Sequence, residues 1–156
     1  MRKTLLAIAS CFLFAQTTPQ DSLNKMIDQW HQSAAQADEK GYFDVIASEG
    51  IYMGTDATER WDKESFRRFA QPHFKKGKAW SFKAIRRATS FSLDRKTAWW
   101  DEDLSTPNLG PSRGTGVAIL TPSGWKIVFY NLSVPIPNPL MSQVKSQIEN
   151  HLIGVN

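Results

Sequence analysis

Hydrophobic and polar positions alternate most clearly between residues 113 and 133, on either side of a short loop that contains Pro122 and Gly124. Alternation with a period of two is typical of strands, so the stretch reads as two strands. Pro122 cannot donate to a strand ladder and Gly124 accommodates a positive φ, which predicts a hairpin turn at the loop. In the second strand polar Lys126 alternates with apolar neighbours, so one face is predicted to be buried and the other partly wet.

The first part of the chain shows a different spacing, with apolar residues three and four apart. This spacing predicts an amphipathic helix that Asp21 or Ser22 caps and that ends at Gly41. His31 lies beside the apolar stripe and is interpreted as a helix-surface residue rather than a ligand. The stripe consists of Leu23, Ile27, Trp30, Ala34 and Ala37.

Three shorter elements are predicted next. A second helix, with Phe43 facing inward, ends near Gly50, and a short strand over 51–54 is followed by a turn and a return strand. Asp62 is a good N-cap for a third helix, which Pro72 is expected to kink or end.

From Trp80 onward the pattern is that of strands, followed by prolines at 135–139 and a last amphipathic helix over 140–153. Helices first and four long strands last predict a single α+β domain over residues 20–145. Because the strands follow one another, we expect an antiparallel meander with helices on one face. A strongly curved sheet of this kind leaves a cavity between itself and the helices.

The N-terminus resembles a secretory signal. Arg2 and Lys3 precede an apolar run over 5–14, and small residues follow at 15–17. This pattern predicts a signal peptide over residues 1–17 and an exported protein, periplasmic or secreted, that is not held in a membrane after signal removal. The alternative is a buried N-terminal helix, although nothing in the run is amphipathic.

Removal of the signal changes the charge and the cysteine content. The chain has 19 basic and 15 acidic residues, and loss of two basic ones leaves 17 against 15, or a net charge of +2. Such a balance is not that of a nucleic-acid-binding protein. The only cysteine, Cys11, would be lost as well, which excludes a disulfide or a thiolate nucleophile in the mature chain.

Two carboxylates are candidates for chemistry. Asp56, in the turn after the short strand, is either a base or hydrogen-bond acceptor for a ligand, or the acceptor in a local Asx-turn. Asp101 and Arg113 lie on adjacent strands. If their face of the sheet lines the cavity, they form a buried pair that could fix a ligand carboxylate or polarise a carbonyl; a structural cross-strand bridge is the equal alternative.

The burial of this pair determines the expected effect of a substitution. Gly114 and Gly116 have the opposite parity to Arg113 and predict a bend in its strand. If Arg113 lies on the concave side, its loss would leave the buried Asp101 carboxylate without a partner and destabilise the fold by about 3 kcal/mol or more. An exposed Arg113 would contribute well under about 1 kcal/mol.

Other candidates are fewer. Asn131 shares the parity of Trp125 and Ile127, so it is predicted to lie on an apolar face where its amide needs a partner. His73 and His151 have no acidic companions, so no metal site is expected, and no motif indicates a cofactor.

Several short motifs occur in an order that resembles the SnoaL-like branch of the nuclear transport factor 2-like (NTF2-like) superfamily. The resemblance covers residues 20–145. The motifs are Gly54-Thr55-Asp56-Ala57, Glu59-Arg60-Trp61, Pro72-His73-Phe74, Ala98-Trp99, Asp101-Glu102, Arg113-Gly114-Thr115-Gly116-Val117, Trp125-Lys126-Ile127, Tyr130-Asn131-Leu132-Ser133 and Pro135-Ile136-Pro137-Asn138.

The resemblance implies a cone-shaped fold with a cavity, and often a homodimer. The superfamily includes isomerases whose catalytic carboxylate lies on the early strand. Because residues 51–54 include no Asp or Glu, the catalytic roles of those isomerases are not assigned to residues of this chain. The candidate ligand-contacting residues are Tyr52, Trp61, Trp99, Asp101, Arg113 and Asn131.

The sequence therefore predicts an exported SnoaL-like protein that binds a small, partly apolar molecule in the cavity, with no assigned reaction. One alternative is an acid–base enzyme of isomerase, cyclase or dehydratase type that uses Asp56 or Asp101. The other is a non-catalytic interaction module whose exposed sheet face forms a homodimer.

Overall fold

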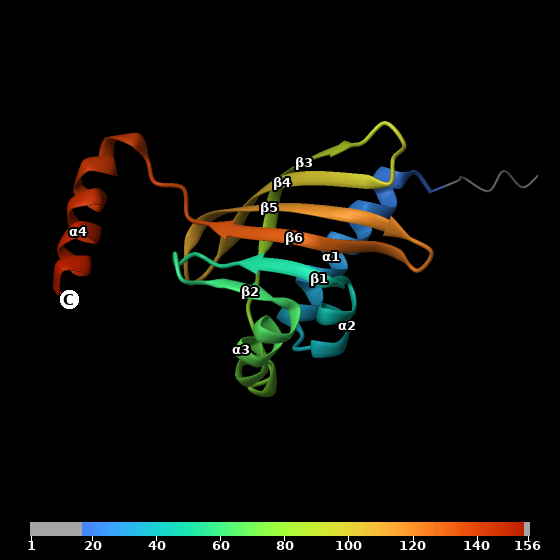
Figure 1. Ribbon diagram of the computed structural model, residues 1–156, viewed down its shortest axis with the longest axis horizontal. Coiled ribbons are helices and arrows are strands. Elements are labelled where there is room, and N and C mark those ends of the chain that lie inside the picture. The colour runs from blue at the N-terminus through green and yellow to red at the C-terminus, as the bar shows by residue number, and fades with distance from the viewer. Residues whose placement is uncertain (1–16, 155–156) are drawn as a thin grey trace, which may run out of the picture.

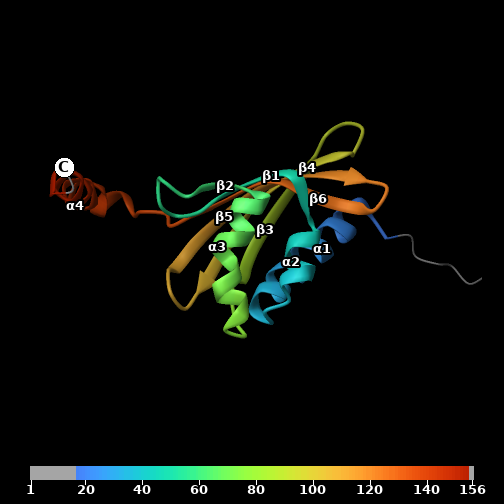
Figure 2. The same cartoon turned by 60° about the horizontal axis from the view of Figure 1, so that its bottom comes forward.

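The computed structural model describes residues 17–154, which form one strongly curved, unclosed sheet with three helices against its concave face (Figure 1). In the turned view these helices, α1, α2 and α3, lie together under the sheet (Figure 2). The predicted α+β class with a curved sheet packed on N-terminal helices is confirmed. The predicted signal segment, apart from Thr17, lies outside the described residues.

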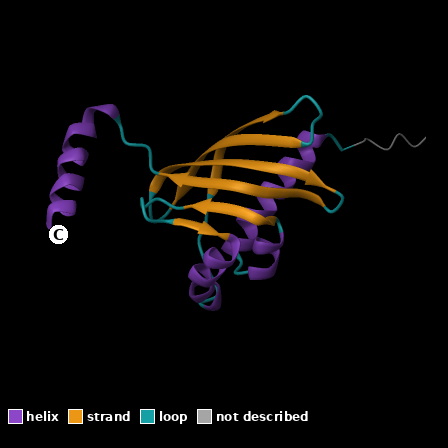
Figure 3. Ribbon diagram, viewed as in Figure 1, coloured by secondary structure: helices purple, strands orange, loops and turns teal. Residues whose placement is uncertain are grey.

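The sheet has six strands in the order β2-β1-β6-β5-β4-β3. Along the chain two helices come first, then two strands, a third helix and the four long strands, and the last helix follows at the C-terminal end (Figure 3). The strands are β1 (Ile46–Met53), β2 (Arg60–Asp62), β3 (Lys83–Phe91), β4 (Thr97–Thr106), β5 (Gly110–Thr121) and β6 (Gly124–Ser133). The helices are α1 (Pro19–Ala35), α2 (Glu39–Asp44), α3 (Lys63–Lys75), the short 3-10 helix η1 (Asn138–Leu140) and α4 (Met141–Gly154).

The four long strands form the predicted antiparallel meander. The sheet as a whole is mixed, because β1 pairs in parallel with β6. The expectation of an entirely antiparallel sheet is wrong for this pair. Parallel neighbours need a long connection, and the connection here is almost the whole domain, from β2 through β5.

The predicted hairpin of β5 and β6 is present. Thr121 pairs with Gly124, which leaves a two-residue turn, and Gly124 has φ +103°. Further along, β6 carries one extra residue, Val128, relative to β5. Such a β-bulge reverses the facing of all residues beyond it. Trp125 therefore faces the helices and so does Tyr130, whereas Asn131 faces outward, and the prediction that Asn131 shares the face of Trp125 is wrong.

The ends of α1 differ from the prediction. Thr18, not Asp21 or Ser22, is the N-cap. Its hydroxyl oxygen accepts a hydrogen bond from the Asp21 amide, and the Asp21 carboxylate accepts one from the Thr18 amide, which completes a capping box. The helix ends at Ala35, because Gln36 and the residues after it leave the helical backbone, and Gly41 lies inside α2 instead. The apolar stripe is buried as predicted at Leu23, Ile27, Trp30 and Ala34.

Asp62 caps α3 as predicted, and its Oδ1 accepts a 2.7 Å hydrogen bond from the Ser65 amide. Pro72 does not end this helix, which continues to Lys75. Pro72 is exposed, so water can satisfy the carbonyl that loses its helical partner, and burial of Phe74 holds the last turn in place. In α2 the predicted helical end is too late, since Ile46 already begins β1.

The last helix, α4, stands away from the sheet at the end of an extended segment (Figure 1). None of its residues is buried, and its apolar residues Ile148 and Leu152 are more than half exposed. Among residues 17–154 no helix is both long enough and apolar enough to cross a membrane.

Candidate functional site

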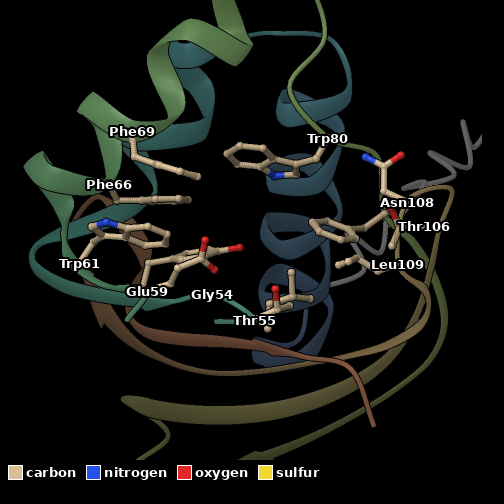
Figure 4. A pocket seen from close by; sticks show the side chains of 13 residues that line it. Gly54, Thr55, Glu59, Trp61, Phe66, Phe69, Trp80, Thr106, Asn108 and Leu109 are labelled. Atoms are coloured by element: carbon tan, nitrogen blue, oxygen red, sulfur yellow. The ribbon is translucent and has the colours of Figure 1, made fainter. Parts of the chain in front are cut away.

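A cavity of about 210 Å³ opens where five segments meet between the sheet and α3 (Figure 4). The segments are β1 with its following turn, β2 with α3, the extended chain before β3, the end of β4 with the β4–β5 loop, and the end of β6. It is lined by Tyr52, Gly54, Thr55, Glu59, Trp61, Phe66, Phe69, Trp80, Phe82, Thr106, Asn108, Leu109 and Leu132.

Aromatic rings make most of the wall and lie nearly parallel to one another. Tyr52 stacks on Phe66 with ring centres 3.8 Å apart and an interplanar angle of 15°. Trp61 stacks on Phe69 at 4.5 Å and 25°. Because residues three apart on a helix share a face, α3 presents both phenylalanines to the same side. The result is an apolar wall of stacked rings, suited to a largely apolar ligand.

Glu59 supplies the one carboxylate among the lining residues. Its Oε2 accepts a 3.2 Å hydrogen bond from the Asp56 amide, and its carbonyl accepts one from the Gly54 amide. A Cβ atom on Gly54 would lie 2.1 Å from Glu59 Oε2, so only glycine leaves room for the carboxylate there. Burial, followed by the negative charge of Glu59, raises the pKa of Tyr52.

Glu59 occurs in one of the sequence motifs, but it is not among the site residues predicted from the sequence. The available signal was the glycine that opens the turn, since a glycine often marks a close approach of other atoms. Tyr52 and Trp61, two of the predicted ligand-contacting residues, do line the cavity. Their contact with a ligand stays a prediction.

Asp56 lies outside the cavity lining and is exposed. Its Oδ1 accepts hydrogen bonds from the Thr58 hydroxyl at 2.5 Å and from the Thr58 amide at 2.8 Å. These bonds hold the pKa of Asp56 below its ordinary value. The local Asx-turn is therefore the interpretation that the geometry bears out.

Asp101 and Arg113 lie on the convex face of the sheet, away from the helices. The Asp101 carboxylate pairs with Arg86, whose Nη2 is 2.8 Å from its Oδ2, whereas Arg113 lies 3.8 Å from Asp103. The expectation of a buried Asp101–Arg113 pair in the cavity is wrong, because the opposite parity faces the helices. With Arg113 half exposed, we expect its loss to cost well under about 1 kcal/mol.

Trp99 and Asn131 lie on this convex face as well. Trp99 is 48% exposed and borders a shallow hollow with Phe129 and Val117. The structure thus brings two of the six predicted contact residues to the cavity and places the other four on the opposite side of the sheet.

A network of polar side chains is buried between α1 and the sheet, outside the cavity lining. Glu102 is fully buried on β4, and its Oε1 accepts a 2.7 Å hydrogen bond from His31 Nε2. Arg87 donates to its Oε2 through Nε at 3.0 Å and Nη2 at 2.9 Å, and Nη2 also reaches Asp28 at 2.9 Å. The Tyr130 hydroxyl lies 3.4 Å from Oε1.

The prediction that His31 is a surface residue is wrong, since only 7% of it is exposed. Burial alone would raise the pKa of Glu102, but hydrogen bonds and charge from His31 and Arg87 outweigh it and hold that pKa below the ordinary value. None of Glu102, His31, Arg87 and Tyr130 lines the cavity. We interpret them as a structural network.

The lowered pKa of Glu102 makes stability depend on pH. A depressed carboxyl pKa contributes stability above the ordinary value of 4.5, and this contribution is lost as the pH falls through the lower folded-state value. We expect the free energy of unfolding to fall more steeply below pH 4.5 in the wild type than in Glu102→Gln. Urea unfolding at a series of pH values measures both slopes, and equal slopes would contradict the assignment.

Two glycines of β5 leave space for large aromatic side chains of the neighbouring strands. A Cβ atom on Gly114 would lie 2.2 Å from Tyr130 Oη, and one on Gly116 would lie 2.3 Å from the Trp100 ring. Their parity opposite to Arg113 is as predicted, but they face the helices. The close approach expected of strand glycines is thus present, on the side that holds the large aromatic residues.

The described residues include no group of three or more His, Cys, Asp or Glu side chains that could hold a metal ion. Residues 23–137 match the family model of the SnoaL-like domain. The chain belongs to the SnoaL-like domain family. A search of curated proteins finds no match to this SnoaL-like chain.

Solved structures share the fold of this SnoaL-like chain at low sequence identity. A protein with a cystatin-like fold from Nostoc punctiforme is 15% identical, with a TM-score of 0.63 over 81% of this chain and 99% of its own. A candidate ketosteroid isomerase from Parabacteroides distasonis is 16% identical, with a TM-score of 0.59 over 78% and 91%. A candidate calcium/calmodulin-dependent protein kinase II association domain from Xanthomonas campestris is 17% identical, with a TM-score of 0.58 over 86% and 99%.

Proposed function

We propose that this SnoaL-like protein binds a small, largely apolar molecule in the aromatic cavity. The observation that carries the proposal is the wall of near-parallel rings around an open volume of about 210 Å³. At about 30 Å³ for each water molecule, that volume corresponds to about seven waters, the size of a one- or two-ring organic molecule. Concave sites lined by aromatic residues with a few polar groups are typical ligand sites.

Asp56 and Asp101 have no part in this proposal, because both carboxylates lie outside the cavity lining. An acid–base reaction that uses either of them has no support from their positions. The reaction, if the bound molecule undergoes one, is left unassigned.

Ligand binding can be measured by isothermal titration calorimetry with indole as the probe. We expect saturable binding that Trp61→Ala weakens about tenfold, since an aromatic stack contributes about 1 kcal/mol beyond its buried area. Trp99→Ala is the matched control, because this tryptophan lies on the convex face. Equal affinities of the two variants, or no saturable binding at all, would contradict the proposal.

We further propose that the protein is exported. The proposal rests on the basic residues and apolar run at the N-terminus. Fractionation of the source cell tests it, with the mass of the recovered chain as readout. Loss of about 17 residues from an extracytoplasmic protein is expected, and an intact cytoplasmic chain would contradict the proposal.

A homodimer through the convex face is a third proposal, and it is supported by the half-exposed Trp99 beside Phe129. A large apolar side chain in a hollow is a common interface anchor. We expect light scattering to show a dimer that Trp99→Glu converts to a monomer. Leu93→Glu is the control, since Leu93 is fully exposed in the β3–β4 turn. A wild-type monomer at high concentration would contradict this proposal.

A further inference from the structure

The charge of the cavity is one-sided. Its thirteen lining residues include six aromatic side chains and one carboxylate, that of Glu59, and no Lys, Arg or His. The remaining polar side chains, Thr55, Thr106 and Asn108, are neutral. A ligand in this cavity therefore meets a single formal charge, which is negative, within apolar walls.

The Glu59 carboxylate is held in place but not neutralised. Oε2 accepts a 3.2 Å hydrogen bond from the Asp56 amide, whereas Oε1 has no hydrogen-bond partner among residues 17–154. No described cation lies within salt-bridge distance of either oxygen, in contrast to the paired carboxylates of Glu102, Asp101 and Asp103. An unpaired carboxylate at the edge of an apolar cavity favours a cation as its partner.

The rings around this carboxylate add to the preference. Figure 4 shows the Glu59 carboxylate reaching into the cavity, with Trp61, Phe66 and Phe69 along one wall and Trp80 across from them. The faces of tryptophan and phenylalanine rings carry a negative electrostatic potential and attract cations within about 6 Å of the ring centre. Carboxylate and ring faces thus favour the same sign of charge.

We propose that the ligand of this cavity is an organic cation, an arylalkylamine of one or two rings. Its ring packs against the aromatic wall that includes Trp61 and Phe69, and its ammonium group donates to Glu59 Oε1. This inference rests on the proposed ligand-binding function and narrows it to a chemical class. An anionic ligand of the same shape would place a second negative charge beside Glu59 with no cation in the lining to compensate.

Three indole probes of similar size but different charge test the inference. They are tryptamine, which is cationic, tryptophol, which is neutral, and indole-3-acetate, which is anionic. We expect tryptamine to bind about tenfold more tightly than tryptophol in isothermal titration calorimetry at low salt, and indole-3-acetate to bind most weakly. Of the three probes, only tryptamine is expected to bind more weakly when salt is added.

Glu59→Gln removes the charge and keeps the size of the side chain. We expect this variant to bind tryptamine about tenfold more weakly and tryptophol as tightly as the wild type does. Asp56→Asn is the matched control. It also removes one negative charge, but from a side chain that lies outside the cavity lining, three residues before Glu59. Its tryptamine affinity is expected to stay within about twofold of the wild type.

The outcomes separate the two levels of the proposal. Equal binding of tryptamine and tryptophol that Glu59→Gln does not change would overturn the cationic ligand and leave the binding function standing. Failure of all three probes to bind would overturn the binding function itself. Retained tryptophol binding by Glu59→Gln shows that this variant is folded, so its loss of tryptamine would support the inference.

Discussion

Arg87→Met is expected to destabilise the protein by about 3–5 kcal/mol, because it removes the main positive partner of a fully buried carboxylate. Arg87 donates two hydrogen bonds to Glu102 Oε2, and its own side chain is only 10% exposed. Without Arg87, His31 and the Tyr130 hydroxyl would be the only groups among residues 17–154 left to partner Glu102. Urea unfolding followed by tryptophan fluorescence measures the loss.

The preceding residue provides a matched control. Arg86 is also paired with two carboxylates, Asp101 and Asp103, but on the convex face, where its side chain is 53% exposed. We expect Arg86→Met to change stability by only a small fraction of the Arg87 effect, since water solvates the charges that remain. Equal losses in the two variants would contradict a special role for burial.

A double-mutant cycle identifies the carboxylate concerned. In Glu102→Gln the buried group is neutral, so further loss of Arg87 should cost less than it does in the wild type. The double variant Arg87→Met/Glu102→Gln is therefore expected to be more stable than the sum of the single losses predicts. Additive losses would show that Arg87 acts through packing rather than through the charge of Glu102.

Gly116→Ala is expected to cost about 1–3 kcal/mol, although it adds only one methyl group. That methyl would lie 2.3 Å from two ring carbons of Trp100, which is itself 3% exposed and packed beside Tyr130. Because the ring is enclosed, the added carbon forces a shift of the ring or of β5. The shift in thermal unfolding midpoint and the urea midpoint both report the cost.

Gly154→Ala is the control for this substitution, since its Cβ would meet nothing within 4 Å at the end of α4. We expect it to leave stability unchanged. Replacement of Trp100 by Phe removes the ring atoms that collide, so Gly116→Ala should cost less in a Trp100→Phe background. A loss of the same size in both backgrounds would mean that the methyl group is not what disturbs the core.

Sequence reasoning reached the fold because the period of the pattern reflects the burial of each element directly. It reached only part of the site because a side chain's face depends on features without a period. The parity that separates Asp101 from Glu102 is correct, but parity alone does not say which set meets the helices. The two glycines opposite Trp100 and Tyr130 could have settled it, because glycine on a strand marks the face where large side chains need room.

The other three errors have separate causes. Asn131 was placed on the wrong face because Val128 adds one residue to β6, and a single bulge leaves no clear mark in the hydrophobic pattern. His31 was interpreted as exposed because its partner, Glu102, lies 71 residues away in the chain. Glu59 was missed because its position depends on a turn and on the bare backbone of Gly54 rather than on periodicity.

The parallel pairing of β1 with β6 has a consequence for the order in which the chain can fold. Ile46 pairs with Ile127 and Met53 with Asn131, so the strand that carries Tyr52 finds its neighbour only after almost all of the domain has been synthesised. Contacts so distant along the chain form slowly, because a large loop must close first. A ribosome-bound chain that stops before β6 would have α3 and its aromatic rings but no β6 for the β1–β2 ribbon to pair with, so we expect the cavity to form only after β6 has been synthesised.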